Sequence, residues 1–254
     1  MSGVRLGPRD MWALWWLAQM GGAPMDIVAA LLALWPLKRS EALTSSTSSG
    51  SEINAYRVSQ RWRAAGKLLD PTRPVPGRSW VVPTKETASG LLNIRVPEWM
   101  PSPMKAAHDI AVMRVRLHLA AGKTHDTWVS ERELRHRNGY LTKPGEPMPH
   151  LHDGHWTDDL GRLHAVEVEL TRKGSADART TLQAAYDTAE VAGAHQLFYF
   201  CASSEVKARV KAAWNDIEHT ETGPELRFSS TAELILNPLA ATGDEQTAAG
   251  GAAS

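Results

Sequence analysis

The spacing of apolar residues changes at Gly66, and this change restricts the folds open to the first part of the chain. Up to that point apolar residues recur at helical spacing, and we expect three helices at about residues 9–20, 24–35 and 52–65. Glycine or proline residues mark the end of each segment. Three short helices in this order are the raw material of a helix-turn-helix.

Beyond Gly66 the pattern becomes that of short strands. We expect strands at residues 67–70 and 78–83, with a turn rich in proline and glycine at 71–77 between them. Thr84 can then cap a short helix over residues 85–92. A hairpin directly after the third helix is typical of a wing, and the sequence therefore predicts a winged helix-turn-helix.

The second half of the chain predicts an α/β arrangement. Its leading helix has Ser102 as cap, Pro103 in the first turn and a stop at Gly122. The elements expected after it are strands at residues 126–135, 150–156 and 162–170, a helix at 175–192, a strand at 195–202, a helix at 204–218, and strands at 225–229 and 232–236. The order of helix, three strands, helix and strand (αβββαβ) implies a core with a mixed sheet.

Together these patterns predict a two-domain protein of the α+β and α/β classes. The winged helix-turn-helix domain takes residues 1–95, a proline-rich linker residues 96–101, and the α/β domain residues 102–237. Residues 238–254 are rich in Ala, Gly and Thr, and we expect them to be disordered. The pattern predicts neither a signal peptide nor a membrane span, and the single cysteine, Cys201, fits a reducing cytoplasm.

The formal net charge is zero, but the charge is unevenly distributed. Residues 1–100 carry 12 Lys and Arg against 7 Asp and Glu, whereas residues 101–254 carry 16 against 21. Seven of the basic residues lie within residues 51–85, together with two acidic ones. A basic module joined to an acidic one indicates a part that grips DNA attached to a part that bears carboxylates.

The third helix and the hairpin carry the expected DNA contacts. We expect the helix to turn Ile53, Tyr56 and Trp62 inward, which leaves amide and guanidinium side chains outward for base edges and phosphates. The DNA-binding candidates are Asn54, Arg57, Gln60 and Arg61 on the helix, and Arg73, Arg78 and Lys85 on or beside the hairpin. The alternative is a solvated helix face or a protein–protein module, including the contact of a homodimer.

The most informative stretch for chemistry is residues 150–173. Asp153 ends one predicted strand, and Glu167 and Glu169 lie two apart on the next strand, which places both glutamates on one face. Converging carboxylates repel each other unless a cation lies between them, and Mg²⁺ is a hard cation that prefers oxygen ligands. Lys173 follows shortly. The alternatives are the solvent face of a half-buried strand and an ordinary Asp-Gly turn.

Four histidines lie near these carboxylates in the sequence, namely His150, His152, His155 and His164. Histidines two residues apart can share a strand face and bind a metal. No cysteine and no helical HExxH motif accompanies them, however, and we therefore do not expect a zinc site.

These features resemble the PD-(D/E)XK nuclease superfamily in the Asp-Gly strand end, the glutamate in an apolar strand, the nearby lysine and the leading helix. More narrowly, the chain resembles the replication-relaxation family of actinobacterial plasmids and mobile elements. The residues that carry this likeness are a winged helix, a helix with His108-Asp109, Asp153-Gly154, and the strand sequence EVEL with a downstream lysine. The resemblance covers about residues 8–236.

The resemblance implies a DNA endonuclease or nickase with Mg²⁺ held by Asp153 and Glu167 and by the backbone of Val168. The family's lysine normally lies two residues after the second acid, where this chain has Glu169. Either Lys173 reaches back into the site, or Glu169 is itself a ligand, or the site is inactive.

The resemblance also suggests accessory residues. Gln183 and Tyr186 are similar to a Gln-Tyr motif that RecB-like nucleases place beside the metal, although ordinary helix surface and core is the alternative. His108 and Glu131 are further candidates for the edge of the site. For the whole chain the resemblance implies double-stranded DNA and replication or conjugation proteins as partners. The alternative function is a non-catalytic DNA-binding accessory protein or transcriptional regulator.

Overall fold

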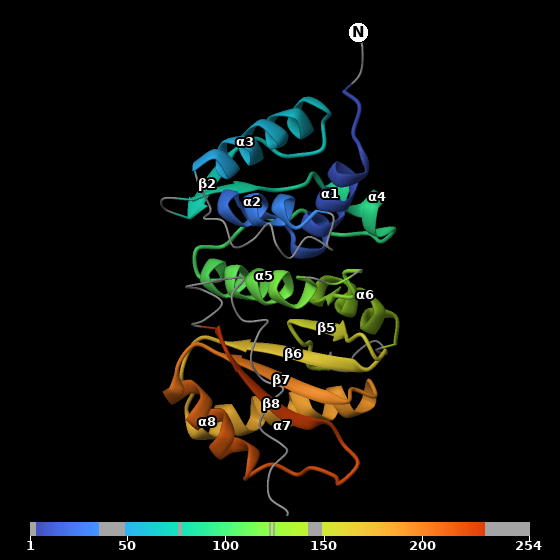
Figure 1. The fold of residues 1–254 in the computed structure, drawn as a ribbon. Helices are drawn as coiled ribbons and strands as arrows, with labels where there is room; N and C mark the ends of the chain where they lie inside the picture. The colour runs from blue at the N-terminus through green and yellow to red at the C-terminus, as the bar shows by residue number, and fades with distance from the viewer. Residues whose placement is uncertain are drawn as a thin grey trace, which may run out of the picture.

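The structure is a computed structural model that describes residues 4–35, 49–75, 78–121, 123, 125–141 and 149–231. Over these residues the fold is mixed α/β, with eight helices, a three-stranded sheet and a five-stranded mixed sheet. Figure 1 shows the order of the layers, with the N-terminal helices and small sheet above, helix α5 in the middle, and the larger sheet below. The predicted strand at 232–236 and the predicted tail at 238–254 lie outside the described residues.

Three helices open the fold, α1 (Pro8–Met20), α2 (Met25–Ala33) and α3 (Ser49–Ala64), and they confirm the three predicted from apolar spacing. They pack around tryptophan side chains that have no exposed surface, such as Trp16 and Trp62. Burial of large aromatic side chains stabilises a small helical module, because each ring removes a large apolar area from water.

The buried face of α3 differs from the predicted one. Ala55, Val58 and Trp62 point inward as expected for a helical stripe, but Ile53 and Tyr56 are 53% and 54% exposed. The prediction that these last two face the core was therefore wrong. The buried Trp62 fixes the rotation of the helix. The buried residues on the same face of α3 therefore include Ala55 and not Tyr56.

The small sheet contains β1 (Ala23–Pro24), β2 (Thr72–Val75) and β3 (Arg78–Val81), paired antiparallel in the order β1-β3-β2. The strand predicted at 67–70 is present only as an isolated antiparallel bridge between Leu68 and Pro83, where the Leu69 amide also donates to the Val82 carbonyl at 2.9 Å. The strand β2 lies instead inside the segment expected to be the turn. Its Pro74 is tolerated because β2 is the edge strand and needs fewer backbone donors. Helix α4 (Lys85–Leu92) follows as predicted, and the Thr84 hydroxyl accepts a hydrogen bond from the Thr87 amide at 3.2 Å.

Helix α5 (Ala106–Ala120) begins after a turn in which the amides of Lys105 and Ala106 donate to the Ser102 carbonyl. The helix therefore begins later than the predicted cap at Ser102. Its Met113 belongs to the N-terminal core, whereas its Val112 and Val115 pack against the larger sheet. A helix buried on two sides is apolar around most of its circumference, and α5 is the layer that both halves of the chain share.

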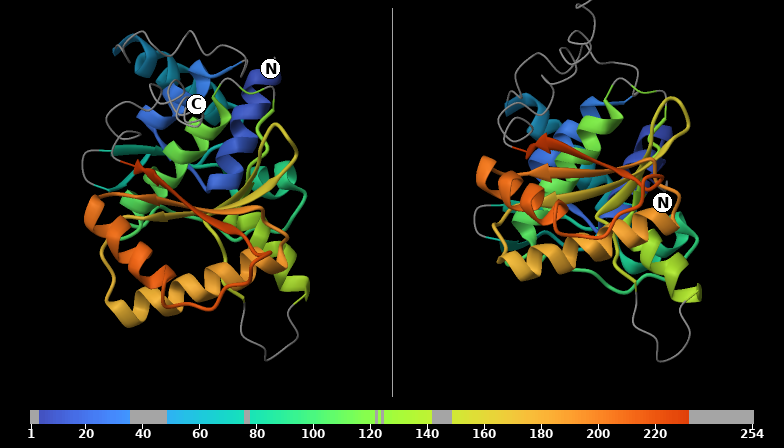
Figure 2. Two further views of the ribbon diagram at one scale, coloured as in Figure 1. Left: turned by 60° about the horizontal axis from the view of Figure 1, so that its bottom comes forward. Right: turned by 90° about the horizontal axis from the view of Figure 1, so that it is seen from below.

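The larger sheet contains β4 (Val129–Ser130), β5 (Gly154–Thr157), β6 (Leu163–Glu169), β7 (Gln196–Cys201) and β8 (Glu225–Ser230), in that spatial order. Strands β4, β5 and β6 pair antiparallel, and β6, β7 and β8 pair parallel. Helices α7 (Ser175–Val191) and α8 (Ser204–Trp214) make the parallel crossovers and cover the face opposite α5 (Figure 2). The predicted mixed sheet is confirmed.

One helix interrupts the predicted order of strands. Residues 126–135 were expected to form a strand, but β4 has only two residues and α6 (Glu131–Leu141) begins directly after it. That prediction was wrong. Charged residues four apart, such as Glu131 and Arg135, form an ion pair along α6, and the Ser130 hydroxyl accepts a hydrogen bond from the Glu133 amide at its start.

Candidate metal and catalytic site

The candidate site lies where β5 begins and β6 ends. Gly154 pairs with Val166 across the two strands, and Asp153 therefore adjoins Glu167. Along β6, Val166 and Val168 pack toward α5, which turns Glu167 and Glu169 to the opposite face. The two strands thus bring together the acidic residues singled out in the sequence.

Gly154 holds the start of β5 against a tryptophan. A Cβ atom at this position would lie only 2.0 Å from the Trp128 ring, and no side chain larger than hydrogen fits there without movement. The Asp-Gly pair is therefore the entry into a strand rather than an ordinary surface turn. The tight packing fixes the backbone from which Asp153 extends.

Asp153 has partners on two elements. Its Oδ2 accepts a hydrogen bond from the Val168 amide at 2.7 Å, and its Oδ1 lies 3.3 Å from Nε2 of His108 on α5. Asp109 and Asp153 together raise the pKa of His108 to about 10, so this imidazole is cationic at neutral pH. The structure thus places His108, one of the accessory candidates, beside Asp153.

Glu167 is largely buried, with 13% of its side chain exposed, and its Oε1 lies 2.7 Å from Nε2 of His150. Burial raises the pKa of Glu167 to about 7, and the neighbouring charge of Asp153 adds to this shift while His150 opposes it. Burial lowers the pKa of His150, but the contact with Glu167 outweighs it and the net shift is upward. His150 therefore gives the buried carboxylate a partner that can carry positive charge.

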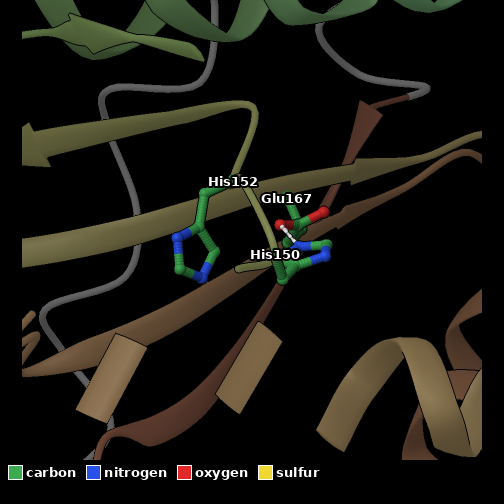
Figure 3. A group of neighbouring side chains, drawn as sticks. All are labelled: His150, His152 and Glu167. Carbon is green, nitrogen blue, oxygen red and sulfur yellow. Dashed lines mark hydrogen bonds and ion pairs between the residues drawn. The ribbon is translucent and has the colours of Figure 1, made fainter. Parts of the chain in front are cut away.

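A second imidazole lies beside this pair (Figure 3). One ligand atom from each of His150, His152 and Glu167 falls within 4.8 Å of the others. His152 donates from Nε2 to the Ala185 carbonyl at 2.9 Å, and its Nδ1 lies 3.1 Å from Nε2 of His155. Burial lowers the pKa of His152 to about 3, which keeps its ring neutral.

Lys173 lies near the carboxylates but is held by one of them. Its ammonium forms an ion pair with Glu169, which lies four residues earlier in the sequence. The charge of Lys173 also lowers the pKa of Glu167. Tyr199 on β7 lies near the same negative charges. Burial raises its pKa most, and the charges of Glu167, Glu169 and Asp153 raise it further. Lys173 and Glu169 are thus on the side of the sheet that carries Glu167.

The two residues compared with a Gln-Tyr motif hold a loop. Gln183 exchanges hydrogen bonds with the backbone of Glu218, and the Tyr186 hydroxyl accepts one from the Thr220 amide at 2.9 Å. Their visible role is to fix the segment between α8 and β8, in line with the alternative of helix surface and core.

Glu131 lies at the start of α6 rather than within a strand. It forms an ion pair with Arg135 and lines a cavity of about 280 Å³ between the end of α1, Trp99, α5 and α6. Asp153 and His108 line the same cavity, which lies on the α5 side of the sheet, and Glu167 is not among its lining residues.

The residues predicted to contact DNA are mostly exposed. Asn54, Arg57 and Gln60 lie on the outer face of α3, and Arg73 and Lys85 are exposed on β2 and α4. The side chain of Arg78 lies outside the described parts of the chain.

Arg61 is a partial exception among the DNA-binding candidates. It forms an ion pair with the buried Asp10 of α1, which also accepts a hydrogen bond from the Trp62 indole at 2.9 Å. Its guanidinium therefore stabilises the packing of α3 on α1.

His150 is the residue that the sequence did not single out as a partner of the carboxylates. It was considered with three other histidines as a zinc cluster, but the structure divides that set, since His164 pairs with Asp158 at 3.1 Å instead. The sequence offered one signal for this contact. His150 lies three residues before Asp153, at the start of the strand predicted to pair with the strand of Glu167.

Comparisons with protein-family models, curated proteins and solved structures found no match for this chain. Among the described residues, no helix is long and apolar enough to cross a lipid bilayer.

Proposed function

We propose that the chain is a DNA-binding protein that hydrolyses phosphodiester bonds in a metal-dependent reaction at Asp153 and Glu167. The observation that carries this proposal is a largely buried glutamate held beside a second carboxylate. Such an arrangement is unfavourable unless a proton or a cation neutralises it. In keeping with the family resemblance, the reaction would serve the replication, relaxation or transfer of a plasmid or mobile element.

The order of elements supports a core of the PD-(D/E)XK type. A leading helix, α5, precedes an antiparallel strand pair that carries the two acids, and parallel β-α-β crossovers follow. Helix α6, inserted between β4 and β5, departs from the expected αβββαβ order. The insertion leaves the pairing of β5 with β6, on which the acids depend, unbroken.

The donor atoms suit a divalent cation. Asp153 and Glu167 would hold it through carboxylate oxygens, the ligands that Mg²⁺ prefers. A divalent ion in such a site activates water as a nucleophile and stabilises negative charge on the phosphate. His108 is a cation beside Asp153, and Lys173 is a cation paired with Glu169, and both would attract and orient the phosphate group.

The N-terminal module would supply the grip on DNA. The exposed face of α3 presents Arg57 and Gln60, side chains that make paired hydrogen bonds to base edges, and Arg73 extends the basic surface onto the hairpin. The order of α1 to α3 followed by β2 and β3 supports a winged helix-turn-helix, a module in which the third helix enters the major groove.

Nicking of supercoiled plasmid tests the proposal. The tag-free chain with Mg²⁺ or Mn²⁺ is expected to convert supercoiled DNA to the open circle, and Glu167→Gln is expected to slow this by roughly a hundredfold. Glu205→Gln, an exposed glutamate on α8, is the matched control and should nick at the rate of the unmodified chain. Equal rates for the Glu167 variant and the unmodified chain would exclude catalysis at this site.

A second function, a non-catalytic DNA-binding accessory protein or regulator, is favoured by one observation. Glu169 occupies the position of the expected lysine and ties up Lys173 in an ion pair, which reduces the positive charge available to a phosphate. This function predicts DNA binding in a gel shift without nicking under any of the metal conditions above.

A further inference from the structure

We propose that His150, His152 and Glu167 form the ligand set of a divalent transition-metal ion, with Zn²⁺ as the representative ion. As an account of the catalytic metal this inference rests on the function proposed above, whereas metal binding itself can be tested without DNA. Ligand atoms of the three residues lie within 4.8 Å of one another. Two imidazoles and one carboxylate, with a further position left open, are the ligands of many catalytic zinc and iron sites.

A metal would change the distances among the three residues. In a tetrahedral zinc site the ligand atoms lie about 3 to 3.5 Å from one another, given metal–ligand bonds of about 2.1 Å. The His150–Glu167 contact of 2.7 Å would open, and His152 would move toward the pair and exchange its hydrogen bond to either His155 or Ala185 for the metal. Figure 3 shows His150 and Glu167 in contact and the His152 ring next to them.

Hydrogen bonds already orient the His152 ring. Coordination through Nδ1 would leave its Nε2 bonded to the Ala185 carbonyl, and coordination through Nε2 would leave its Nδ1 bonded to His155. Either way the nitrogen that does not bind metal keeps a partner, which is the usual outer-shell arrangement of metal-ligating histidines.

The exposure of the three residues suits a site that is reached from one side. His152 is 1% exposed, whereas the side chain of His150 is 21% exposed. An ion held here would therefore keep a coordination position open toward solvent on the His150 side, as catalytic rather than structural metal sites do. The charges of Glu167 and the adjoining Asp153 would balance the ion.

The donor set predicts a preference between metals. Imidazole nitrogen is a good ligand for zinc, copper, iron and nickel, whereas Mg²⁺ takes oxygen ligands. We therefore expect the chain to bind Zn²⁺ and Co²⁺ more tightly than Mg²⁺, and His150 to contribute to this preference.

Calorimetric titration of the tag-free, EDTA-treated chain with Zn²⁺ tests the inference, and Co²⁺ absorption reports the ligands. One ion per chain is expected. His150→Gln, which can keep a hydrogen bond to Glu167, and Glu167→Gln should each weaken binding at least about tenfold. His125→Ala removes an exposed histidine elsewhere and should leave binding unchanged. Thermal unfolding of the metal-free variants checks that they are folded.

Absence of saturable Zn²⁺ binding, or equal affinity in the unmodified chain and in a folded His150→Gln variant, would overturn the inference. Zinc binding that depends on His150, without any DNA cleavage, upholds the inference and counts against the proposed hydrolysis. Cleavage that requires Mg²⁺ and survives His150→Gln upholds the proposed hydrolysis and overturns the inference as an account of the catalytic metal.

Discussion

At Glu167 three influences act on one carboxylate. Burial and the charge of Asp153 raise its pKa, to about 7, and the 2.7 Å contact with His150 works in the opposite direction. Below about pH 7 a metal ion at this carboxylate must therefore displace a proton. The same contact that lowers the cost of burying the charge also holds the ligand atoms in place.

Gly154 offers a test of the backbone that carries Asp153. Because a Cβ at this position would lie 2.0 Å from the Trp128 ring, Gly154→Ala must displace either the ring or the start of β5. We expect a loss of about 1 to 3 kcal/mol in the free energy of unfolding, as for other overpacked positions. Urea denaturation followed by circular dichroism measures it.

Gly139→Ala is the matched control for Gly154→Ala. Gly139 lies in α6 with open space around the site of a Cβ, and alanine there should be neutral or stabilising by up to about 1 kcal/mol. A Gly154→Ala variant as stable as this control would show that Trp128 does not pack on the strand in the way described.

At the scale of elements, the sequence predicted those whose pattern is local. Strand β6, helix α7 and strand β7 were placed within a few residues, because alternating or helical spacing of apolar residues decides each one. Helix α6 was missed because residues 126–135 begin with a strand-like pattern. Only the two residues of β4 pair with β5, and the chain turns into a helix directly after them. The rotation of α3 likewise depends on which neighbour Trp62 meets.

The site was predictable in part for the same reason. Spacing along β6 placed Glu167 and Glu169 on one face, and the strand order placed Asp153 beside them. The role of His150 depends on how its loop returns to Glu167, and no local pattern in the sequence encodes that contact.

Helix α3 carries two arginines that the structure separates by role. Arg57 is exposed, whereas Arg61 forms an ion pair with the buried Asp10. We expect Arg57→Ala to weaken duplex binding and to reduce the slope of log K against log salt by about 0.9, the loss of one phosphate contact, with stability unchanged. Arg61→Ala should instead lower the free energy of unfolding by roughly 1 to 3 kcal/mol, because it leaves Asp10 short of a partner.

Gel shifts across a salt series and urea denaturation separate the two effects of these arginines. Ala64→Ser is the control for both, because Ala64 is exposed at the end of α3 and its replacement should change neither duplex binding nor stability. If Arg57→Ala binds a duplex as tightly as the unmodified chain at low salt, α3 is not the helix that contacts DNA.

At the scale of the whole molecule, α5 joins the two halves into one packed body. Met113 and Leu117 belong to the N-terminal core, and Val112 and Val115 to the core under the larger sheet. Arg116, with no exposed surface, stacks over Trp15 and Trp16 of α1 while it pairs with Asp126 at 2.7 Å. The boundary predicted at residues 96–101 thus precedes a helix whose side chains belong to the cores of both halves.

This shared helix predicts that the halves unfold in a single transition. Seven of the ten tryptophans precede residue 100, so their fluorescence reports mainly on the N-terminal half, and the buried thiol of Cys201 on β7 reports on the larger sheet. In a urea series the loss of native fluorescence and the gain of thiol reactivity should share one midpoint, because exposing either core uncovers a face of α5. Met113→Ala should lower both midpoints together, since it leaves a cavity in the core that anchors the helix. Thiol exposure at a urea concentration where the fluorescence is still native would show instead that the two halves are independent domains. Helix α5 would then stay folded on one half after the other has unfolded.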